Sequence, residues 1–328
     1  MIMVSYITRR KVGKTFQYFD GSVRIADTAQ IERMNKLAIP PAWKNVEIAK
    51  KASTKVQARG VDKANRVQAI YSPEYRLKQE KAKFNRILRF ADRLPALRKQ
   101  VDKDLARKKL GKEKVLATIV RLIDEAYFRV GNERYAKEHQ TYGITTLRSK
   151  HTNVTSNTIT FDFVGKSGKR HVKKIKDSKI ARIIKRLDEL PGHEIFRYQD
   201  NEGVMHDLHS SDVNEYVKKH MGDEFTAKDF RTWGGTLLAT SEVLADTLKE
   251  DASQTARKRA AAKIVKRVAK RLGNTPAVAR SSYIDPRVLL AYEDNKTLTK
   301  LRNEIADIKP KKYRSTEEQG VLMLLKDD

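Results

Sequence analysis

The period of the hydrophobic and polar positions changes near residue 74. Before that point, short stretches alternate between apolar and polar residues and end in turn-forming residues, as at 16–19 followed by Asp20-Gly21-Ser22. Residues 56–62 and 66–71 alternate in the same way, so we expect two strands joined by a polar turn. The pattern therefore predicts a small β-rich domain over residues 1–74.

After Ser72-Pro73, apolar residues recur every three or four positions among many Lys and Arg, which is the spacing of one face of a helix. Helices are expected at residues 75–90, 94–110, 115–128, 178–190, 236–249 and 258–272. The helix at 115–128 is the most apolar and is expected to lie in the core. The pattern predicts a larger, mainly helical domain over residues 75–328.

A β-hairpin interrupts these helices. Residues 158–164 and 169–175 alternate at period two on either side of the turn at 165–168. Lys166 lies at the tip of this hairpin. A lysine on a mobile tip can reach a leaving group as a proton donor, whereas most tip lysines only increase solubility.

The stretch 272–286 joins a helix end to a candidate nucleophile. Gly273 fits the left-handed residue that closes a helix and Pro276 cannot continue one, so Asn274 is expected on a turn, where its amide can point at a ligand. Tyr283 follows after a short polar segment. A phenol has a pKa of about 10 and attacks nothing at neutral pH unless cations surround it. Because the chain has 12 tyrosines, an ordinary half-buried tyrosine is the alternative interpretation.

The composition indicates the kind of partner. The 328 residues include 69 Lys+Arg and 41 Asp+Glu, a formal net charge of +28 that is spread along the whole length, and such a field attracts a polyanion. No apolar run of about 18 residues is visible, and no signal-peptide core stands at the start, where Met1-Ile2-Met3-Val4 soon meets Arg9-Arg10-Lys11. Nucleic acid is therefore a better expected partner than a membrane.

Metal and cofactor chemistry have little support in the sequence. The chain has no cysteine, which excludes a disulfide, a thiolate nucleophile and a zinc–thiolate site. His206 and His209 are the only close histidine pair, and without a third ligand we interpret them as part of a polar surface segment. A phosphate-binding glycine loop is missing as well. We expect neither a metal nor a nucleotide cofactor.

Two arginines are candidate phosphate ligands. Arg129 is expected at the end of the core helix, where it can turn into a groove or remain a solvated cap. Lys228 and Arg231 fall three apart on one face of a predicted helical turn. An arginine so placed can donate two parallel hydrogen bonds to phosphate. Salt bridges from Arg231 to Asp229 or Glu224 are the alternative.

Further residues are candidates for contact with DNA. Gln68 could pair with an adenine edge, and Tyr71 could pack on a sugar or a base. Both could equally be solvent-facing positions of a strand. The other candidate DNA contacts are Arg134, Tyr135 and Lys228.

A set of short motifs resembles, in order, those of the type IB DNA topoisomerases of the short bacterial and poxvirus kind. Each motif is weak by itself, but the ordered set is specific, and the similarity extends over nearly the full length, including residues 39–43 and 60–62. The motifs are Phe128-Arg129-Val130-Gly131, Phe163-Val164-Gly165-Lys166, Lys228-Asp229-Phe230-Arg231-Thr232, Leu272-Gly273-Asn274-Thr275-Pro276 and Ser282-Tyr283-Ile284.

The resemblance implies a fold and an activity. The fold is α+β, of the tyrosine recombinase and topoisomerase IB type, with a small β-rich N-terminal domain and a larger, mainly α-helical catalytic domain that carries a small β-hairpin. A single chain would close as a clamp around duplex DNA inside the cell. The activity is the relaxation of supercoiled DNA by transient cleavage and religation of one strand, through a 3′-phosphotyrosyl intermediate and without ATP or a metal.

The resemblance also implies a role for each catalytic residue. Tyr283 would attack the phosphodiester, and Arg129 and Arg231 would hold its nonbridging oxygens in the transition state. Asn274 would add a hydrogen bond. Lys166 would protonate the leaving 5′-oxygen with help from Arg129.

Two positions depart from the poxvirus members, and two other classes of protein remain as alternatives. Asn274 stands where those members have histidine, so hydrogen bonding but not proton donation is implied there. Ala69 stands where they have a DNA-contacting tyrosine, so their strict cleavage-site preference is not implied.

A tyrosine recombinase, the first alternative class, usually has His-x-x-Arg, with histidine where this chain has Lys228, and a helical N-terminal domain. A noncatalytic basic DNA-coating protein would explain the charge but not the ordered motifs.

Overall fold

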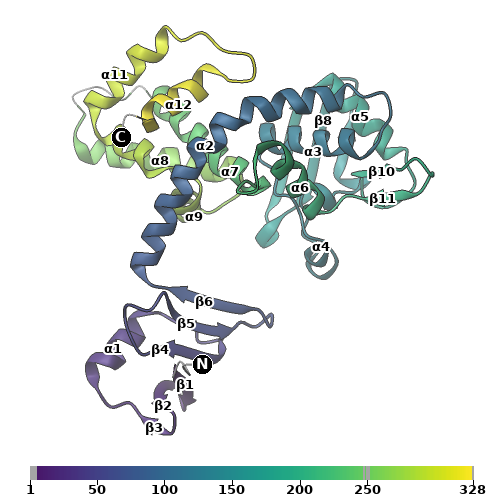
Figure 1. The fold of residues 1–328 in the computed structure, drawn as a ribbon. Helices are drawn as coiled ribbons and strands as arrows, with labels where there is room; N and C mark the ends of the chain where they lie inside the picture. The colour runs from purple at the N-terminus through teal and green to yellow at the C-terminus, as the bar shows by residue number, and fades with distance from the viewer. Residues whose placement is uncertain (1–5, 247, 249–251, 327–328) are drawn as a thin grey trace. The chain divides into compact units, whose positions relative to one another are not determined.

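The computed structural model describes residues 6–246, 248 and 252–326. The chain forms two compact units, Met1–Asn85 and Arg86–Asp328. Figure 1 shows that the first unit is built mainly of strands and the second mainly of helices. This is the α+β class that the sequence predicts. The predicted boundary at residue 74 lies in the first turn of helix α2 (Pro73–Leu105), which begins in the N-terminal unit and ends in the C-terminal unit.

The N-terminal unit contains an antiparallel sheet of six strands in the order β3-β2-β1-β4-β5-β6, counted over the described residues. Its strands are β1 (Tyr6–Val12), β2 (Thr15–Asp20), β3 (Val23–Arg24), β4 (Lys44–Ala49), β5 (Val56–Val61) and β6 (Val67–Tyr71). Helix α1 (Thr28–Lys36), which the alternation does not predict, is capped by the Asp27 carboxylate. The β-rich character predicted for this segment, including the paired strands β5 and β6, is confirmed.

The C-terminal unit has one large hydrophobic core. Its further helices are α3 (Lys112–Ala126), α4 (Glu133–His139), α5 (Ser178–Asp188), α6 (Ser210–Met221), α7 (Ala227–Leu244), α8 (Gln254–Leu272), α9 (Pro276–Ser282), α10 (Pro286–Glu293), α11 (Asn295–Ala306) and α12 (Thr316–Lys326). Its strands are β7 (Thr152–Val154), β8 (Thr158–Val164), β9 (Arg170–Lys176), β10 (Arg197–Gln199) and β11 (Met205–Asp207). In Figure 1, α5 and β8 lie toward one end of this unit and α8, α11 and α12 toward the other, with α7 between them.

Helix α2 differs from the two separate helices that were expected at 75–90 and 94–110. The structure has one helix that continues through Pro95. Proline lacks the N–H that would bond to the carbonyl four residues earlier, which normally breaks or kinks a helix. Here the Ala91 carbonyl accepts a hydrogen bond from Arg314 Nη2 at 2.8 Å. A distant side chain thus replaces the missing donor, which explains why the predicted interruption was wrong.

The elements that carry the candidate site largely follow the prediction. The core helix α3 and the hairpin β8–β9 are confirmed. Helix α7 begins at Ala227, earlier than the expected 236, because Thr226 and Asp229 form a capping box at its start. The expected end of this helix, Lys249, lies outside the described residues.

The segment after Gly273 differs from the prediction in one respect. Gly273 closes α8 in the left-handed conformation, with φ 66°, as expected. The segment that leads to Tyr283 is not an irregular polar bridge but the short helix α9, because Thr275 caps it and Pro276 occupies its first turn, where a proline is favoured. Helices α10 and α11 follow it.

Candidate active site

Four of the five predicted catalytic residues come together where helices begin and end. Arg129 follows the C-terminus of α3, and Asn274 follows Gly273 at the end of α8. Arg231 lies in the second turn of α7, and Tyr283 is the C-cap of α9. These helices pack around one core, which brings together residues that are 145 positions apart in the case of Arg129 and Asn274.

Arg231 is buried and is fixed by main-chain oxygens. Its side chain donates from Nη1 to the Tyr127 carbonyl at 2.5 Å and from Nη2 to the Leu272 carbonyl at 2.9 Å. Its guanidinium carbon lies 5.1 Å from the centroid of the Tyr283 ring. Burial lowers the pKa of Arg231 to about 10, and the neighbouring charge of Arg129 acts in the same direction.

The alternative salt bridges for Arg231 are absent from the described residues. The Asp229 carboxylate accepts a hydrogen bond from Arg86 at 2.8 Å, and Glu224 pairs with Arg89 at 2.5 Å. Both acids are therefore used by arginines of α2. This leaves Arg231 free to face an anion.

Arg129 and Asn274 form a second pair in the site. Arg129 Nη2 donates to Asn274 Oδ1 at 2.5 Å and to the Gly273 carbonyl at 3.1 Å. This bond assigns the amide orientation of Asn274, because only its oxygen can accept from a guanidinium. Asn274 Nδ2 and Arg231 Nε are buried and have no partner within the described part of the chain. Two donors thus remain available for the oxygens of an anionic ligand.

The environment of Tyr283 favours its phenolate. Burial by itself raises the pKa of this phenol, but the positive charge of Arg231, followed by the charges of Arg129 and Lys228, lowers it below its ordinary value. Tyr292, the next tyrosine along the chain and therefore an alternative candidate nucleophile, has a pKa shifted in the opposite direction. It is buried, its hydroxyl donates to Asp246, and burial together with that carboxylate raises its pKa. Tyr283 is the better placed nucleophile of the two.

Lys166 is the fifth predicted catalytic residue and does not join the other four. Its side chain is exposed at the hairpin tip between β8 and β9. Among the contacts of the described residues, no hydrogen bond or ion pair links it to Arg129, Arg231, Asn274 or Tyr283. Its role as an acid remains a prediction that requires a movement of the tip or the presence of a substrate.

Two residues of β9 that the sequence analysis missed contribute to the site. Lys173 Nζ donates to the Ala126 carbonyl at 2.5 Å, at the end of α3. Burial, followed by the charges of Arg231 and Arg129, lowers the pKa of Lys173 to about 8. His171 stacks on Phe163 with ring centroids 5.3 Å apart, and its Nε2 is buried without a partner in the described chain. Burial, followed by the charge of Lys173, lowers the pKa of His171 to about 4.

A small cavity separates these residues from the two arginines. Arg129, Arg231, His171 and Lys173 are among the residues that line it, and its volume of about 10 Å³ has room for a single water molecule. No carboxylate lines it within the described residues. The site is therefore strongly cationic, and it suits a ligand that brings its own negative charge.

The candidate DNA-contact residues lie in different surroundings. In the N-terminal unit, Gln68 Nε2 donates to Asp62 at 3.0 Å, and the Tyr71 ring lies 5.2 Å from that of Tyr75. In the C-terminal unit, Arg134 pairs with Glu138 on exposed α4, and Tyr135 is 39% exposed beside it. Lys228 is exposed on α7, and its charge contributes to the lowered pKa of Tyr283. Of these residues, Lys228 is the one associated with the candidate site.

Neither a metal centre nor a membrane-spanning helix is found in the described chain. No group of three or more metal-ligating His, Cys, Asp or Glu residues occurs among residues 6–246, 248 and 252–326. His206 pairs with Asp200 at 2.7 Å and His209 pairs with Glu133, so the two histidines have separate partners. Over the same residues, no helix has the length and apolar character needed to cross a bilayer.

Two family models match the chain. The model for the catalytic core of eukaryotic DNA topoisomerase I matches residues 72–315. The model for the N-terminal domain of bacterial DNA topoisomerase IB matches residues 15–62. Together they cover most of the chain, and the first includes all five predicted catalytic positions.

Individual relatives give the same result. DNA topoisomerase 1B of Acanthamoeba polyphaga mimivirus is 35% identical over 297 residues, which is 88% of this chain and 88% of that protein. DNA topoisomerase 1B of vaccinia virus strain Copenhagen is 23% identical over 249 residues, or 75% of this chain and 76% of the viral protein. DNA topoisomerase 1 of Mycosarcoma maydis is 28% identical over 181 residues, or 50% of this chain but only 18% of that longer protein.

Proposed function

Since the chain belongs to the type IB DNA topoisomerase family, we propose that it relaxes supercoiled duplex DNA through a covalent phosphotyrosyl intermediate on Tyr283. The observation that carries this proposal is the position of the Tyr283 phenol against Arg231, with the donors Arg231 Nε and Asn274 Nδ2 buried and unpartnered among the described residues. Such donors suit the nonbridging oxygens of a phosphodiester, whose negative charge grows in the transition state. The phenol and the phosphate ligands therefore belong to one site.

The proposed reaction exchanges one phosphate ester for another. The Tyr283 phenol releases its proton to solvent and its oxygen attacks the phosphorus, the bond from phosphorus to the 5′-oxygen breaks, and the electron pair leaves with that oxygen. Lys166 supplies the proton that the 5′-hydroxyl takes up, and the hairpin tip must approach the DNA for this step. Religation runs the same steps in reverse. Because no net bond is lost, neither ATP nor a metal is needed.

The other features of the proposal concern the partner and the assembly. Duplex DNA is the substrate, and the excess of 69 Lys+Arg over 41 Asp+Glu supports binding to its phosphates. One chain would act as a monomeric clamp, located with DNA in the cell. The recombinase and DNA-coating alternatives lose support because the matched core is that of a topoisomerase, over residues 72–315.

The proposal is tested with supercoiled plasmid in EDTA without ATP. We expect relaxation of positive and negative supercoils, together with a covalent adduct when denaturant is added to a reaction on a nicked suicide duplex. Tyr283→Phe should abolish the adduct and retain DNA binding, whereas Tyr292→Phe, the matched control, should still form it. Strict dependence on ATP or a metal, or a labelled peptide that maps to another tyrosine, would contradict the proposed mechanism.

A further inference from the structure

Helix α7 contains a pair of adjacent glycines in its interior, directly after Trp233. Glycine in the interior of a helix makes the helix less stable than alanine would, so a glycine there calls for a local cause. At Gly235 the cause is steric. A Cβ atom built on Gly235 would lie 2.5 Å from the Tyr283 carbonyl oxygen and 2.9 Å from the Tyr283 Cβ. Real Cβ atoms do not approach a backbone atom so closely, so only glycine lets the Tyr283 main chain rest on α7 at this distance.

The next residue holds the same segment by hydrogen bonds. Thr236 is fully buried, and its hydroxyl donates to the Tyr283 carbonyl at 3.3 Å. The same hydroxyl accepts from the Asp285 N–H at 3.1 Å. A single side chain therefore fixes both ends of the turn that joins α9 to α10. A hydroxyl can fill both roles because it is a donor and an acceptor at once.

Gly235, which contacts the Tyr283 main chain, and Arg231 lie on one face of α7. Residues four apart are stacked along the same side of a helix, and Arg231 and Gly235 are four apart. Arg231 contacts the ring of Tyr283, at 5.1 Å from the centroid, and Gly235 contacts its main chain. One rigid helix thus determines where the ring and the backbone of the proposed nucleophile lie relative to each other.

We propose that Gly235 and Thr236 are positioning residues that set the location of the Tyr283 oxygen for in-line attack. This inference rests on the proposed function of Tyr283 as the nucleophile. A displacement of the reacting atoms by about 1 Å can reduce a rate by about 10²-fold. An alanine at position 235 must push the Tyr283 main chain away by a displacement of that order, whereas the substitution removes no Lys or Arg side chain.

The test measures single-turnover cleavage of a suicide duplex at saturating enzyme. Gly235→Ala should reduce the cleavage rate by about 10²-fold and leave the DNA dissociation constant nearly unchanged. The clash should also lower the melting temperature, so the rate is measured well below it. Gly111→Ala is the matched control, because a Cβ at Gly111 meets nothing within 4 Å. A duplex with a 5′-bridging sulfur distinguishes loss of the proton donor from misalignment of the nucleophile. Its thiolate leaves without an acid, but the attack still requires an aligned Tyr283 oxygen. The loss in Gly235→Ala should persist on that duplex.

A second pair of variants keeps the inference falsifiable if Gly235→Ala does not fold. Thr236→Val, which keeps the shape but removes the hydroxyl, should slow cleavage by about 10-fold, and Thr236→Ser should recover most of the rate. Wild-type cleavage in Gly235→Ala, or equal rates for the Val and Ser variants, would overturn the inference while the proposed function stands. Absence of an adduct in the unmutated protein would instead overturn the proposed function.

Discussion

The guanidinium of Arg231 is held by two main-chain carbonyls instead of by carboxylates. Both carbonyls belong to helix C-termini, those of α3 and α8, where the backbone carries partial negative charge. This arrangement fixes the position of the arginine without neutralising it. Arg129 likewise donates a hydrogen bond to a main-chain carbonyl, that of Gly273. The positive potential of the two arginines therefore remains available for a phosphate.

At the scale of single residues, the acid role of Lys166 is open to a direct test. Lys166→Ala should slow cleavage by roughly 10²- to 10⁴-fold, the range expected for loss of a positioned proton donor. A 5′-bridging sulfur, whose thiolate leaves without protonation, should restore most of the rate. Lys174→Ala, an exposed lysine of β9, serves as the control and should cleave normally. An equal defect on both duplexes would exclude the acid role.

His171 makes a contribution to stability that depends on pH. Its pKa in the folded chain is about 4, whereas an unfolded histidine has a pKa of about 6.5. Between these values the unfolded state binds more protons, so this contribution is complete above about pH 6.5 and is lost as the pH falls toward 4. The neighbouring charges that disfavour protonation are those of Lys173, Arg129, Arg231 and Lys169.

The measurement for His171 is the melting temperature at pH 7.5 and pH 5. His171→Phe, which can still stack on Phe163, should lose less stability on acidification than the unmutated protein. His193→Phe changes an exposed histidine and should leave the difference between the two pH values as it is. An unaltered pH difference in His171→Phe would show that the folded chain tolerates the protonated ring.

Residues of the site differ in how far the sequence predicts them. Arg129, Arg231, Asn274 and Tyr283 were identified from ordered motifs, and the structure brings them together. His171 and Lys173 were not, because alternating Lys and His on a hairpin strand has the pattern of a solvent-facing surface. Their burial depends on the end of α3 and on the glycines at 165 and 273, which leave room for the His171 ring. Such tertiary contacts have no local signature.

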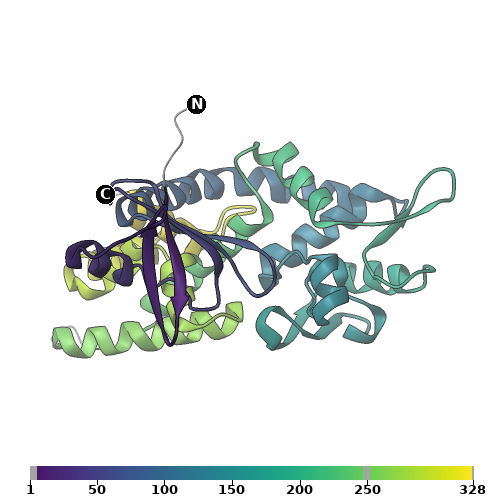
Figure 2. The ribbon, with the colours of Figure 1, turned by 90° about the horizontal axis from the view of Figure 1, so that it is seen from below.

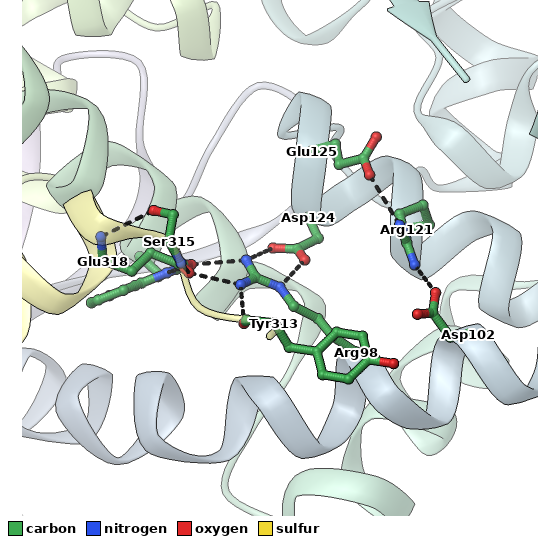
Figure 3. A network of polar contacts seen from close by, with 9 residues as sticks. Arg98, Asp102, Arg121, Asp124, Glu125, Tyr313, Ser315 and Glu318 are labelled. Atoms are coloured by element: carbon green, nitrogen blue, oxygen red, sulfur yellow. Dashed lines mark hydrogen bonds and ion pairs between the residues drawn. The ribbon is translucent and has the colours of Figure 1, made fainter. Parts of the chain in front are cut away.

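At the scale of elements, helix α12 is tied to the rest of the C-terminal unit by a buried ionic network (Figure 3). Arg98 of α2 bonds to Asp124 of α3 at 2.7 Å and to Glu318 of α12 at 2.8 Å. Glu318 also accepts from Trp233 Nε1 of α7 at 3.1 Å. Figure 3 shows Arg98 between the two carboxylates, with Arg121 forming a separate group with Asp102 and Glu125. One carboxylate of α12 therefore links three helices, including the one that carries Arg231.

Loss of the Glu318 charge should destabilise this unit. Glu318 is 3% exposed, and breaking a buried ion pair costs about 3–5 kcal/mol because one charge is left uncompensated. The cost of Glu318→Gln should lie near the lower end of this range, because Arg98 is still paired with Asp124. Urea unfolding followed by tryptophan fluorescence measures the change. Asp162→Asn breaks the exposed pair with Arg170 and should cost below about 1 kcal/mol. Equal costs for the two variants would refute the role given to the network.

The helices and the hairpin were predictable to the extent that their signals are local. The spacing Ser315-x-x-Glu318, for example, is a local signal for a capping box, and the structure has both of its hydrogen bonds, at 3.0 and 3.2 Å. The continuity of α2 through Pro95 was not predictable, because the compensating donor, Arg314, is 223 positions from Ala91. Helix α9 was missed for a different reason. It is only seven residues long, so its pattern is too short to distinguish from a polar loop.

At the scale of the whole molecule, the net charge of +28 should make DNA binding strongly dependent on salt. Helix α8 presents much of this charge, and Figure 2 shows it (light green) as one straight helix. Its exposed basic residues are Lys258, Arg259, Lys263, Lys266, Arg267, Lys270 and Arg271. Each phosphate that a protein neutralises contributes about −0.9 to the slope of log affinity against log salt.

DNA affinity should fall by about 10³-fold or more between 50 and 200 mM salt, as expected for six or more phosphate contacts. Lys263→Gln should reduce the slope by about one if this lysine contacts a phosphate. Tyr283→Phe leaves every cation in place and should keep the slope. Fluorescence anisotropy of a labelled duplex gives both values, and an affinity insensitive to salt would contradict binding through phosphates.

The bond between Arg314 and the Ala91 carbonyl also has a consequence for the order of folding during synthesis. Helix α2 emerges from the ribosome early, but its proline gap and its Arg98 charge are both satisfied by residues 313–318. Until that segment has been translated, the Ala91 carbonyl can bond only to water, and Asp124 is the one carboxylate of this network that Arg98 can reach. A chain truncated before residue 313 would hold all five proposed catalytic residues yet lack the partners that α2 has in the complete C-terminal unit.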